Sequence, residues 1–295
     1  MIELLDNPDH DVLDGRHGAY THAYARERLG DRDLRIAIEA GDLVGFGRGV
    51  LLDARRVLDL RTRSAGALLL TGGILVGPTA AALHGCSAIG GFPIHVCVSY
   101  AQRIRSRPGL IVHQGATRPK DTTVIDGLTV LTVDAAIAEA LCTAPRRAAL
   151  ACTDEILHAL RPDDRAVFVA TVAERLATRP DRRGTRRAAE LLALATGLPK
   201  SPTESAFLLT IVDAGFPRPV CQYEVGRDRF DFAWPDQRVA LEHVANIDKD
   251  RTMPTINTPY RGWLVIRADT QDLADPTALY GRLRTALQTR TYAAA

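Results

Sequence analysis

Lysine is nearly absent from this sequence of 295 residues. Only three of the 37 basic residues are lysine, so arginine carries almost all of the positive charge. The planar guanidinium group of arginine binds phosphate through two parallel hydrogen bonds. A GC-rich genome would produce the same bias, so the composition is compatible with phosphate recognition without establishing it.

The sequence also lacks an apolar run long enough to cross a membrane. The longest run, residues 65–76, is interrupted by glycines and is shorter than the ~20 residues of a transmembrane helix. The acidic N-terminus, MIELLDNPDHDVLDG, has neither the basic nor the apolar region of a secretion signal. We therefore expect a cytoplasmic protein with no membrane partner. Hydrophobic residues make up 46% of the chain, which excludes disorder as its main state.

Cysteine is scarce, with five scattered positions. A chain of this length needs no disulfides, so we expect reduced and mostly buried thiols. Two H-x-C pairs, His84 with Cys86 and His95 with Cys97, are spaced too closely for most structural zinc sites, and hydrogen-bonded histidines are the better interpretation. The segment GGILVGPT has the glycine spacing of a phosphate loop, but Pro78 stands where that loop needs its lysine. We expect no metal and no other cofactor.

The net charge of +2 excludes a protein that coats nucleic acid with a uniformly basic surface. Two local runs, residues 99–120 and 175–187, each carry a net charge of +5. They predict a secondary basic surface, and the alternative is that both runs are solvated faces. The arginines that we assign to this surface are Arg103, Arg105, Arg107, Arg182, Arg183 and Arg186.

Residues 1–58 predict a winged helix-turn-helix. Thr21 is a typical N-cap for a helix that ends at Leu29, and Gly30 suits the residue after a helix. A second helix is expected from Asp31 to Gly41. Glycines at 45, 47 and 49 then predict a tight turn between two short strands. Two helices with a β-hairpin behind them make a winged helix.

In a winged helix the second helix enters the major groove and the wing lies along the phosphate backbone. We therefore expect Arg32 and Arg35 to reach base edges and Arg48 to contact the backbone from the wing tip. Arg26 and Arg28 on the first helix should lie near the backbone. The module has a net charge of −3, which disfavours nonspecific DNA binding, and a protein–protein module is the alternative.

The sequence after residue 58 predicts two further domains, 59–195 and 196–295, with a joint near residues 179–185. The fold class is therefore α/β of the mixed α+β type, beginning with the winged helix-turn-helix. Helices and strands of the middle domain are expected at 79–83, 94–99, 110–113, 128–133, 135–141, 146–160 and 166–177. The last domain should begin with a helix after the capping residues Ser201, Pro202 and Glu204. Its later elements are expected at 222–225, 229–234, 239–243, 263–267 and 275–288.

Three carboxylates are candidates for a site in the last domain. Glu204 lies on the expected helix, Asp231 on one strand and Glu242 on the next. Such a trio can hold a divalent cation that activates water against a phosphodiester. A working site needs a further group, and Val244 can neither bind a metal nor stabilise an anion. The alternative is that these carboxylates are solvated or cap backbone groups.

Several short segments follow one another in a recognisable order: RGVLL, ILVGPTAAALHG, FPIHVCV, IDGLTVLTVDAAI, SPTESAF, AGFPRPVCQYEV, RFDFAWPDQRVALE and GWLVIRADTQDL. Together they cover nearly the whole chain and resemble bacterial AbiEi-type antitoxins of type IV toxin–antitoxin systems. The specificity lies in the order of the segments. The resemblance implies a winged helix that represses its own operon and a cognate nucleotidyltransferase toxin encoded beside it.

The C-terminal third resembles the PD-(D/E)xK, very-short-patch-repair-like nuclease domain of many actinobacterial relatives. In those relatives the second strand reads E-x-D-G, which falls on residues 242–245, where this chain has Val-Ala in place of Asp-Gly. Only Glu204, Asp231 and Glu242 carry over, and Lys249 is a candidate substitute. We therefore expect a remnant of a nuclease, with no catalytic residues.

These observations predict a DNA-binding transcriptional autoregulator that acts as the antitoxin of its toxin. Its partners would be double-stranded DNA of its own operator and the toxin, with direct contact to the toxin left open. A single winged helix covers few base pairs, so we expect two protomers on the operator. The competing hypotheses are a metal-dependent DNA endonuclease of the PD-(D/E)xK class and a protein–protein scaffold.

Overall fold

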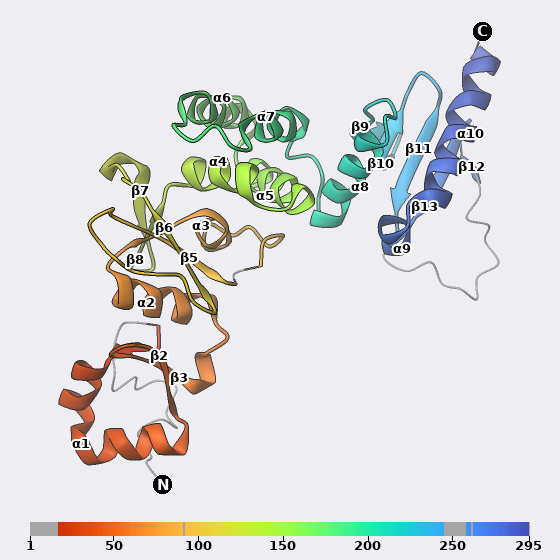
Figure 1. The fold of residues 1–295 in the computed structure, drawn as a ribbon. Helices are drawn as coiled ribbons and strands as arrows, with labels where there is room; N and C mark the ends of the chain where they lie inside the picture. Colours follow the sequence, from red (N-terminus) through yellow and green to blue (C-terminus); the bar gives the residue numbers. More distant parts are fainter. Residues whose placement is uncertain (1–16, 91, 245–257, 261, 295) are drawn as a thin grey trace. The chain divides into compact units, whose positions relative to one another are not determined.

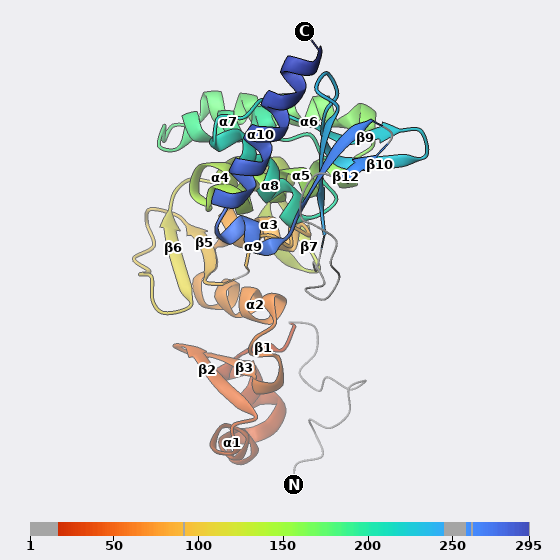
Figure 2. The same cartoon turned by 90° about the vertical axis from the view of Figure 1, so that its right-hand side faces the viewer.

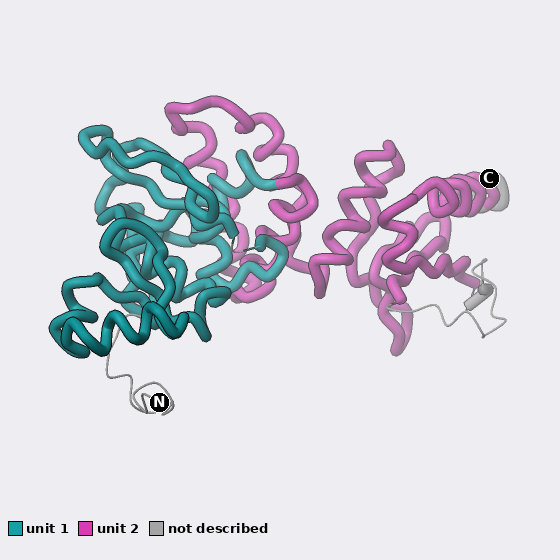
Figure 3. Tube along the Cα trace, turned by 60° about the horizontal axis from the view of Figure 1, so that its bottom comes forward, with its two compact units in different colours: residues 1–144 teal, residues 145–295 magenta. Residues whose placement is uncertain are grey.

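The computed structural model describes residues 17–90, 92–244, 258–260 and 262–294. The chain forms two compact units, unit 1 (residues 1–144) and unit 2 (residues 145–295), shown in Figure 3. Both units contain helices and strands, so the predicted α+β class is confirmed. The domain boundaries expected at 58 and 195 fall inside these units. Among the described residues, no helix is both long and apolar enough to cross a membrane.

Unit 1 begins with a helix-turn-helix and a hairpin (Figure 1). The elements are β1 (Ala19–Thr21), α1 (His22–Ala40), β2 (Leu43–Gly47) and β3 (Val50–Asp53). The strands form an antiparallel sheet in the order β1-β3-β2. The two helices and the hairpin match the prediction, whereas β1 is an additional strand.

Local signals define both helices within α1. Thr21 Oγ1 accepts a hydrogen bond from the Tyr24 amide at 3.1 Å, which caps the first helix. Gly30, at φ 78° and ψ 164°, breaks α1 into the two predicted helices, and Gly41 ends the second at φ 81°. Leu34 and Ala37, at helical spacing, are buried in the core of this module.

The second part of unit 1 is a five-stranded mixed sheet with helices. Its elements are α2 (Leu60–Thr71), β4 (Ile74–Leu75), α3 (Gly77–Leu83), β5 (Ile94–Val98), β6 (Leu110–Gln114), β7 (Thr122–Ile125), β8 (Leu128–Leu131) and α4 (Val133–Thr143). The strand order is β6-β5-β4-β8-β7, with β5–β6 and β4–β8 parallel. The expected β5, β6, β8, α3 and α4 are present, whereas α2, β4 and β7 were not predicted.

Helix α2 packs directly against the hairpin. At Gly66, an added Cβ would lie 2.8 Å from Leu52 Cδ2 and 3.1 Å from Phe46 Cδ1, so a larger residue would push these side chains aside. Ala19 and Leu52 belong to the same hydrophobic core as the five-stranded sheet. The helix-turn-helix therefore shares a core with the rest of unit 1.

Unit 2 combines helices with a second five-stranded sheet. Its elements are α5 (Arg146–Ala159), α6 (Pro162–Thr178), α7 (Thr185–Leu194), α8 (Pro202–Asp213), β9 (Val220–Val225), β10 (Asp228–Trp234), β11 (Val239–His243), β12 (Thr258–Tyr260), β13 (Trp263–Ala268), α9 (Thr270–Ala274) and α10 (Thr277–Ala294). The strand order is β12-β13-β11-β10-β9, and only β11–β13 is parallel. The joint expected at 179–185 is the connection between α6 and α7.

Helix α8 begins with the predicted Ser201 cap. Ser201 Oγ accepts a hydrogen bond from the Glu204 amide at 3.2 Å, and Pro202 occupies the first turn. The Glu204 carboxylate accepts a hydrogen bond from the Lys200 amide at 2.8 Å, one residue earlier than the expected capping box. This hydrogen bond holds the carboxylate at the N-terminus of the helix.

Buried Asp154 of α5 holds the segment that leads into α8. Its Oδ1 accepts hydrogen bonds from the Thr196 and Gly197 amides at 2.8 and 2.9 Å, and its Oδ2 accepts one from Ser205 Oγ at 2.8 Å. Asp154 is only 1% exposed, so water cannot replace these bonds. One side chain therefore fixes both the turn after α7 and the start of α8.

We expect Asp154→Ala to lower the free energy of unfolding of unit 2 by about 3 kcal/mol, because it leaves the buried Gly197 amide, the buried Ser205 hydroxyl and the half-buried Thr196 amide without an acceptor. The two tryptophans of the chain, Trp234 and Trp263, both lie in unit 2, so their fluorescence during urea unfolding reports on this unit. The control is Asp164→Ala, which removes an exposed pair with Arg161 and should cost less than about 0.5 kcal/mol. Equal effects of the two substitutions would contradict this role of Asp154.

Candidate functional sites

The arginines expected to read DNA are exposed. Arg32 and Arg35 lie on the second helix of α1, and Arg48 lies in the turn between β2 and β3. Within the described part of the chain, none of the three makes a side-chain hydrogen bond or ion pair. Their guanidinium groups are therefore available to a ligand.

Arg26 and Arg28 on the first helix are also exposed but make contacts. Arg26 Nε lies 3.7 Å from Asp31 Oδ1, with 62% and 88% of the two side chains exposed. The Arg28 guanidinium lies 5.5 Å from the centre of the Tyr24 ring. Exposed contacts of this kind are weak, so either arginine can exchange its partner for a phosphate.

The basic run at 99–120 divides into two kinds of arginine. Arg103 and Arg105 are exposed. Arg107 is half-buried: its Nη2 donates a hydrogen bond to the Phe46 carbonyl, and its guanidinium lies 5.2 Å from the centre of the Phe46 ring. Burial lowers the pKa of Arg107. Arg107 is therefore a contact within unit 1 rather than part of an open basic surface.

The arginines of the second run contact groups of unit 2. Arg182 Nη1 donates hydrogen bonds to the carbonyls of Leu176 and Ala177 at the end of α6. Arg183 pairs with Asp181 through two nitrogens at 2.8 to 3.0 Å. The Asp181 pKa is lowered by its hydrogen bonds from Arg183. Part of the positive charge of this run is thus neutralised locally.

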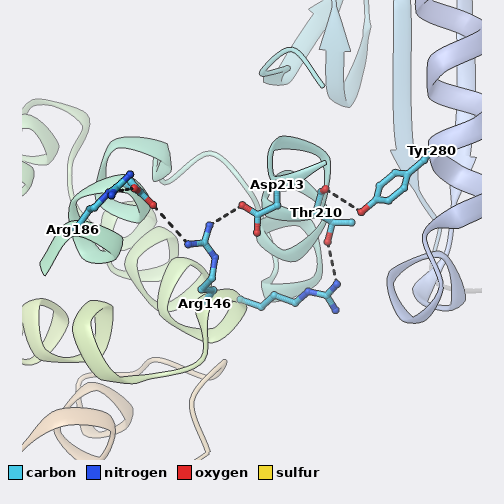
Figure 4. A network of polar contacts seen from close by, with 7 residues as sticks. Arg146, Arg186, Thr210, Asp213 and Tyr280 are labelled. Carbon is cyan, nitrogen blue, oxygen red and sulfur yellow. Dashed lines mark hydrogen bonds and ion pairs between the residues drawn. The ribbon is translucent and has the colours of Figure 1, made fainter. Parts of the chain in front are cut away.

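Arg186 belongs to a polar network that links the helices of unit 2 (Figure 4). It lies 3.3 Å from Glu190, which is 3.9 Å from Arg146. Arg146 in turn lies 2.7 Å from Asp213 of α8. The same helix presents the Thr210 carbonyl, which accepts a hydrogen bond from the Tyr280 hydroxyl at 3.3 Å. This network connects α5, α7, α8 and α10.

The predicted carboxylates come together at the start of α8. Gln222 Nε2 donates hydrogen bonds to Glu204 Oε2 at 3.0 Å and to Asp231 Oδ1 at 3.3 Å. Asp231 Oδ2 accepts a further bond from the His243 amide of β11 at 2.9 Å. Gln222 has a φ of 53°, a left-handed conformation that is costly for a residue with a side chain. The Gln222 amide thus lies between two of the carboxylates.

Glu242 completes the carboxylate cluster of Glu204, Asp231 and Glu242. The pairing of Phe232 with Leu241 brings Asp231 next to Glu242, and the parallel β11–β13 ladder pairs Glu242 with Arg267. The two side chains of that ladder pair approach to 3.9 Å. Three neighbouring strands therefore carry polar side chains at adjacent positions.

Burial raises the pKa of two of these groups. For Glu204, burial has the largest effect and the Asp231 carboxylate adds to it, against the hydrogen bond from the Lys200 amide. The pKa of Glu242 is raised mainly by burial, while Arg267 opposes the shift and the Asp231 carboxylate adds to it. Carboxylates crowded in this way favour a bound cation or a shared donor.

The residues present fit a hydrogen-bonded cluster better than a metal site. Both Asp231 oxygens and one Glu204 oxygen already accept hydrogen bonds from this chain. Val244 adds no ligand, and Ala245 and Lys249 lie outside the described residues. Within the described ranges, Gln222 Oε1 and His243 Nε2 are buried without a partner. The donors to these carboxylates are therefore the Gln222 side-chain amide and the backbone amides of Lys200 and His243.

No family model matches the chain. Two proteins of Mycobacterium tuberculosis, the uncharacterized protein Rv2248 of strain H37Rv and the uncharacterized protein MT2308 of strain CDC 1551, are each 33% identical to it over 221 residues. The match covers 72% of this chain and 77% of each relative. This chain belongs to their family. The crystal structure of the RV2827C protein from M. tuberculosis is similar with a TM-score of 0.44 and 16% identity, over 74% of this chain and 85% of that one.

This member of the family also carries a histidine pair that the spacing of its H-x-C motifs did not predict. His95 Nδ1 and His113 Nε2 are 3.0 Å apart, and the rings are stacked. Burial and the neighbouring His113 lower the pKa of His95 to about 4, and burial lowers that of His113. Burial, together with the charge of Glu139, raises the pKa of Cys97. These groups are therefore neutral near pH 7 and form a hydrogen-bonded pair beside a protonated thiol.

Two further residues of this family member carry contacts that sequence reasoning did not assign. Gln222 had only its place on an expected strand as a signal, and Arg107 had only its place in a basic run. Their partners are the cluster carboxylates and Phe46, which are distant in the sequence or lie on other elements. Such partners follow from tertiary structure and have no local signature.

Proposed function

We propose that the protein is a sequence-specific DNA-binding autoregulator that acts as the antitoxin of a type IV toxin–antitoxin pair. The observation that carries the proposal is the set of three exposed and unpaired guanidinium groups, Arg32, Arg35 and Arg48. They lie on the second helix and the wing of a helix-turn-helix, the elements that contact base edges and phosphates in such modules.

The antitoxin role rests on the order of short segments that resembles AbiEi-type antitoxins. That resemblance supports a cognate nucleotidyltransferase toxin encoded nearby as the second partner. It also supports regulation of the protein's own operon. Two protomers on the operator are expected because a single winged helix covers few base pairs. The family relatives are uncharacterized and add no functional argument.

We expect Arg35→Ala to weaken binding to the DNA upstream of the protein's own gene by about 1 to 3 kcal/mol and to relax specificity at one base pair. Arg48→Ala should instead weaken binding to all sequences alike and reduce the salt dependence by about one unit of slope. Fluorescence anisotropy with a labelled upstream duplex and a scrambled duplex measures both effects.

The matched control is Arg284→Ala, which removes an exposed arginine of unit 2 and should leave DNA affinity unchanged. Footprinting on the same duplex should show protection of two half-sites. The recognition-helix assignment is wrong if Arg35→Ala binds the upstream duplex as tightly as the unchanged protein.

Protection against the toxin should not depend on operator binding alone. We expect Arg32→Ala combined with Arg35→Ala, expressed from an independent promoter, to keep cells alive when the cognate toxin is induced. Point variants suit this test because Leu52 shares a core with the five-stranded sheet, so deletion of residues 1–58 would uncover that core. Cell death with the double variant at normal protein levels would reduce the mechanism to repression.

The second candidate function is a metal-dependent DNA endonuclease at the carboxylate cluster. The close approach of Glu204 and Asp231 through Gln222 supports it, whereas the bonded oxygens and Val244 oppose it. We expect supercoiled plasmid to stay intact with the purified protein and Mg²⁺ or Mn²⁺. Nicking by the unchanged protein that is lost in Glu242→Ala would make the endonuclease the better assignment.

A further inference from the structure

The loop between β5 and β6, residues 99–109, touches the wing of the helix-turn-helix. Arg107 donates to the carbonyl of Phe46 and lies over its ring, and Phe46 is two residues from Arg48. At Gly47, an added Cβ would collide with the Arg107 guanidinium. Figure 2 shows the connection from β5 to β6 reaching down to the end of β2. The loop and the wing are therefore neighbours within unit 1.

Further contacts fix the β5–β6 loop along its length. Gln102 Nε2 donates a hydrogen bond to the Thr71 carbonyl at 3.2 Å, at the end of α2. Ser106 Oγ accepts a bond from the Val112 amide at 2.9 Å. Because residues 102, 106 and 107 are held, the intervening chain is ordered before any ligand arrives. A surface that is already ordered loses little conformational entropy on binding.

Arg103 and Arg105 lie between these fixed points. Both are exposed, and among the described residues neither makes a side-chain hydrogen bond or ion pair. The whole run 99–120 contains no acidic residue. The loop thus presents two unpaired guanidinium groups, and Arg105 is only two residues from the Arg107 contact with the wing.

We propose that Arg103 and Arg105 extend the DNA-binding surface of the wing and contact phosphates that flank the half-site read by α1. This inference rests on the proposed DNA-binding function. Arg48 and these two residues form one phosphate-contacting surface, and Arg107 is a positioning residue that keeps the loop against the wing. The partner is double-stranded DNA, because the loop adjoins the turn that follows a duplex backbone.

Charge explains why the module needs this extension. Residues 1–58, which comprise the helix-turn-helix and the acidic sequence before it, have a net charge of −3 and so gain little from the electrostatic attraction that dominates DNA affinity. The adjoining run at 99–120 carries +5. The basic loop of the following domain therefore supplies phosphate contacts that the acidic module lacks.

The test is the salt dependence of binding to the upstream duplex. Each phosphate contact contributes about 0.9 to the slope of log affinity against log salt concentration. Arg103→Gln with Arg105→Gln should reduce the slope by about 1.8 and weaken binding at 0.1 M salt at least about tenfold. The matched control, Arg227→Gln with Arg284→Gln, removes two exposed arginines of unit 2 and should leave the slope unchanged.

Arg107 is tested by two substitutions in the full chain. Arg107→Ala should reduce the slope by more than the loss of one phosphate contact would, because the released loop no longer holds Arg103 and Arg105 beside the wing. Arg107→Lys keeps a donor for the Phe46 carbonyl and should restore most of the slope. Thermal unfolding of each variant separates loss of the contact from loss of the fold.

The outcomes distinguish the two proposals. If the unchanged protein binds no upstream duplex, the proposed function itself fails. If it binds and Arg35→Ala weakens it, but Arg103→Gln with Arg105→Gln keeps the full slope, only the extended surface is overturned. Preferential binding of a single-stranded RNA of the same sequence, lost in that double variant, would also overturn the assignment of DNA as partner of the loop.

Discussion

The close packing around Phe46 is the contact on which the arrangement of unit 1 depends. Gly66 of α2 allows the helix to approach the Phe46 ring from within the core. Arg107 and Arg63 place their guanidinium groups 5.2 and 5.7 Å from the centre of the same ring. One aromatic side chain therefore joins the hairpin, α2 and the β5–β6 loop. It adds to the core that Ala19 and Leu52 share with the five-stranded sheet, and it gives the basic loop a fixed position beside the wing.

Capping residues in the sequence were sufficient to predict the helices that have one at each end. Thr21, Gly30 and Gly41 act through bonds or backbone angles within a few residues, so the sequence pattern locates both helices of α1. The sequence did not predict helix α2, because Gly66 interrupts the helical pattern of apolar residues and because Thr62 and Ser64 are polar although they are buried. The short strands β1 and β4 exist only through pairing with β3, β5 and β8, and no pattern of two or three residues predicts such pairing.

The candidate sites were also predictable only in part. The order of a helix and two paired strands was enough to predict that Glu204, Asp231 and Glu242 lie close together, because adjacent strands hold their side chains at fixed spacing. The role of Gln222 was not predictable, since it depends on a left-handed backbone angle inside a strand. The role of Arg107 was not predictable either. Its partner, the Phe46 carbonyl, lies 61 residues away in the sequence, and only the tertiary fold brings the two together.

Under the proposed DNA-binding function, the packing of the helix-turn-helix against the rest of unit 1 has a consequence for the spacing of DNA half-sites. The approach of α2 at Gly66, the Arg107 bond to the Phe46 carbonyl and the shared core hold the helix-turn-helix against the rest of unit 1. In each copy bound to a duplex, the second helix would then keep one orientation relative to the rest of unit 1. B-form DNA returns the same groove face about every 10.5 base pairs. Two copies that contact each other on one duplex would thus need half-sites in one rotational phase, and a half-turn insertion between the half-sites would weaken their joint binding.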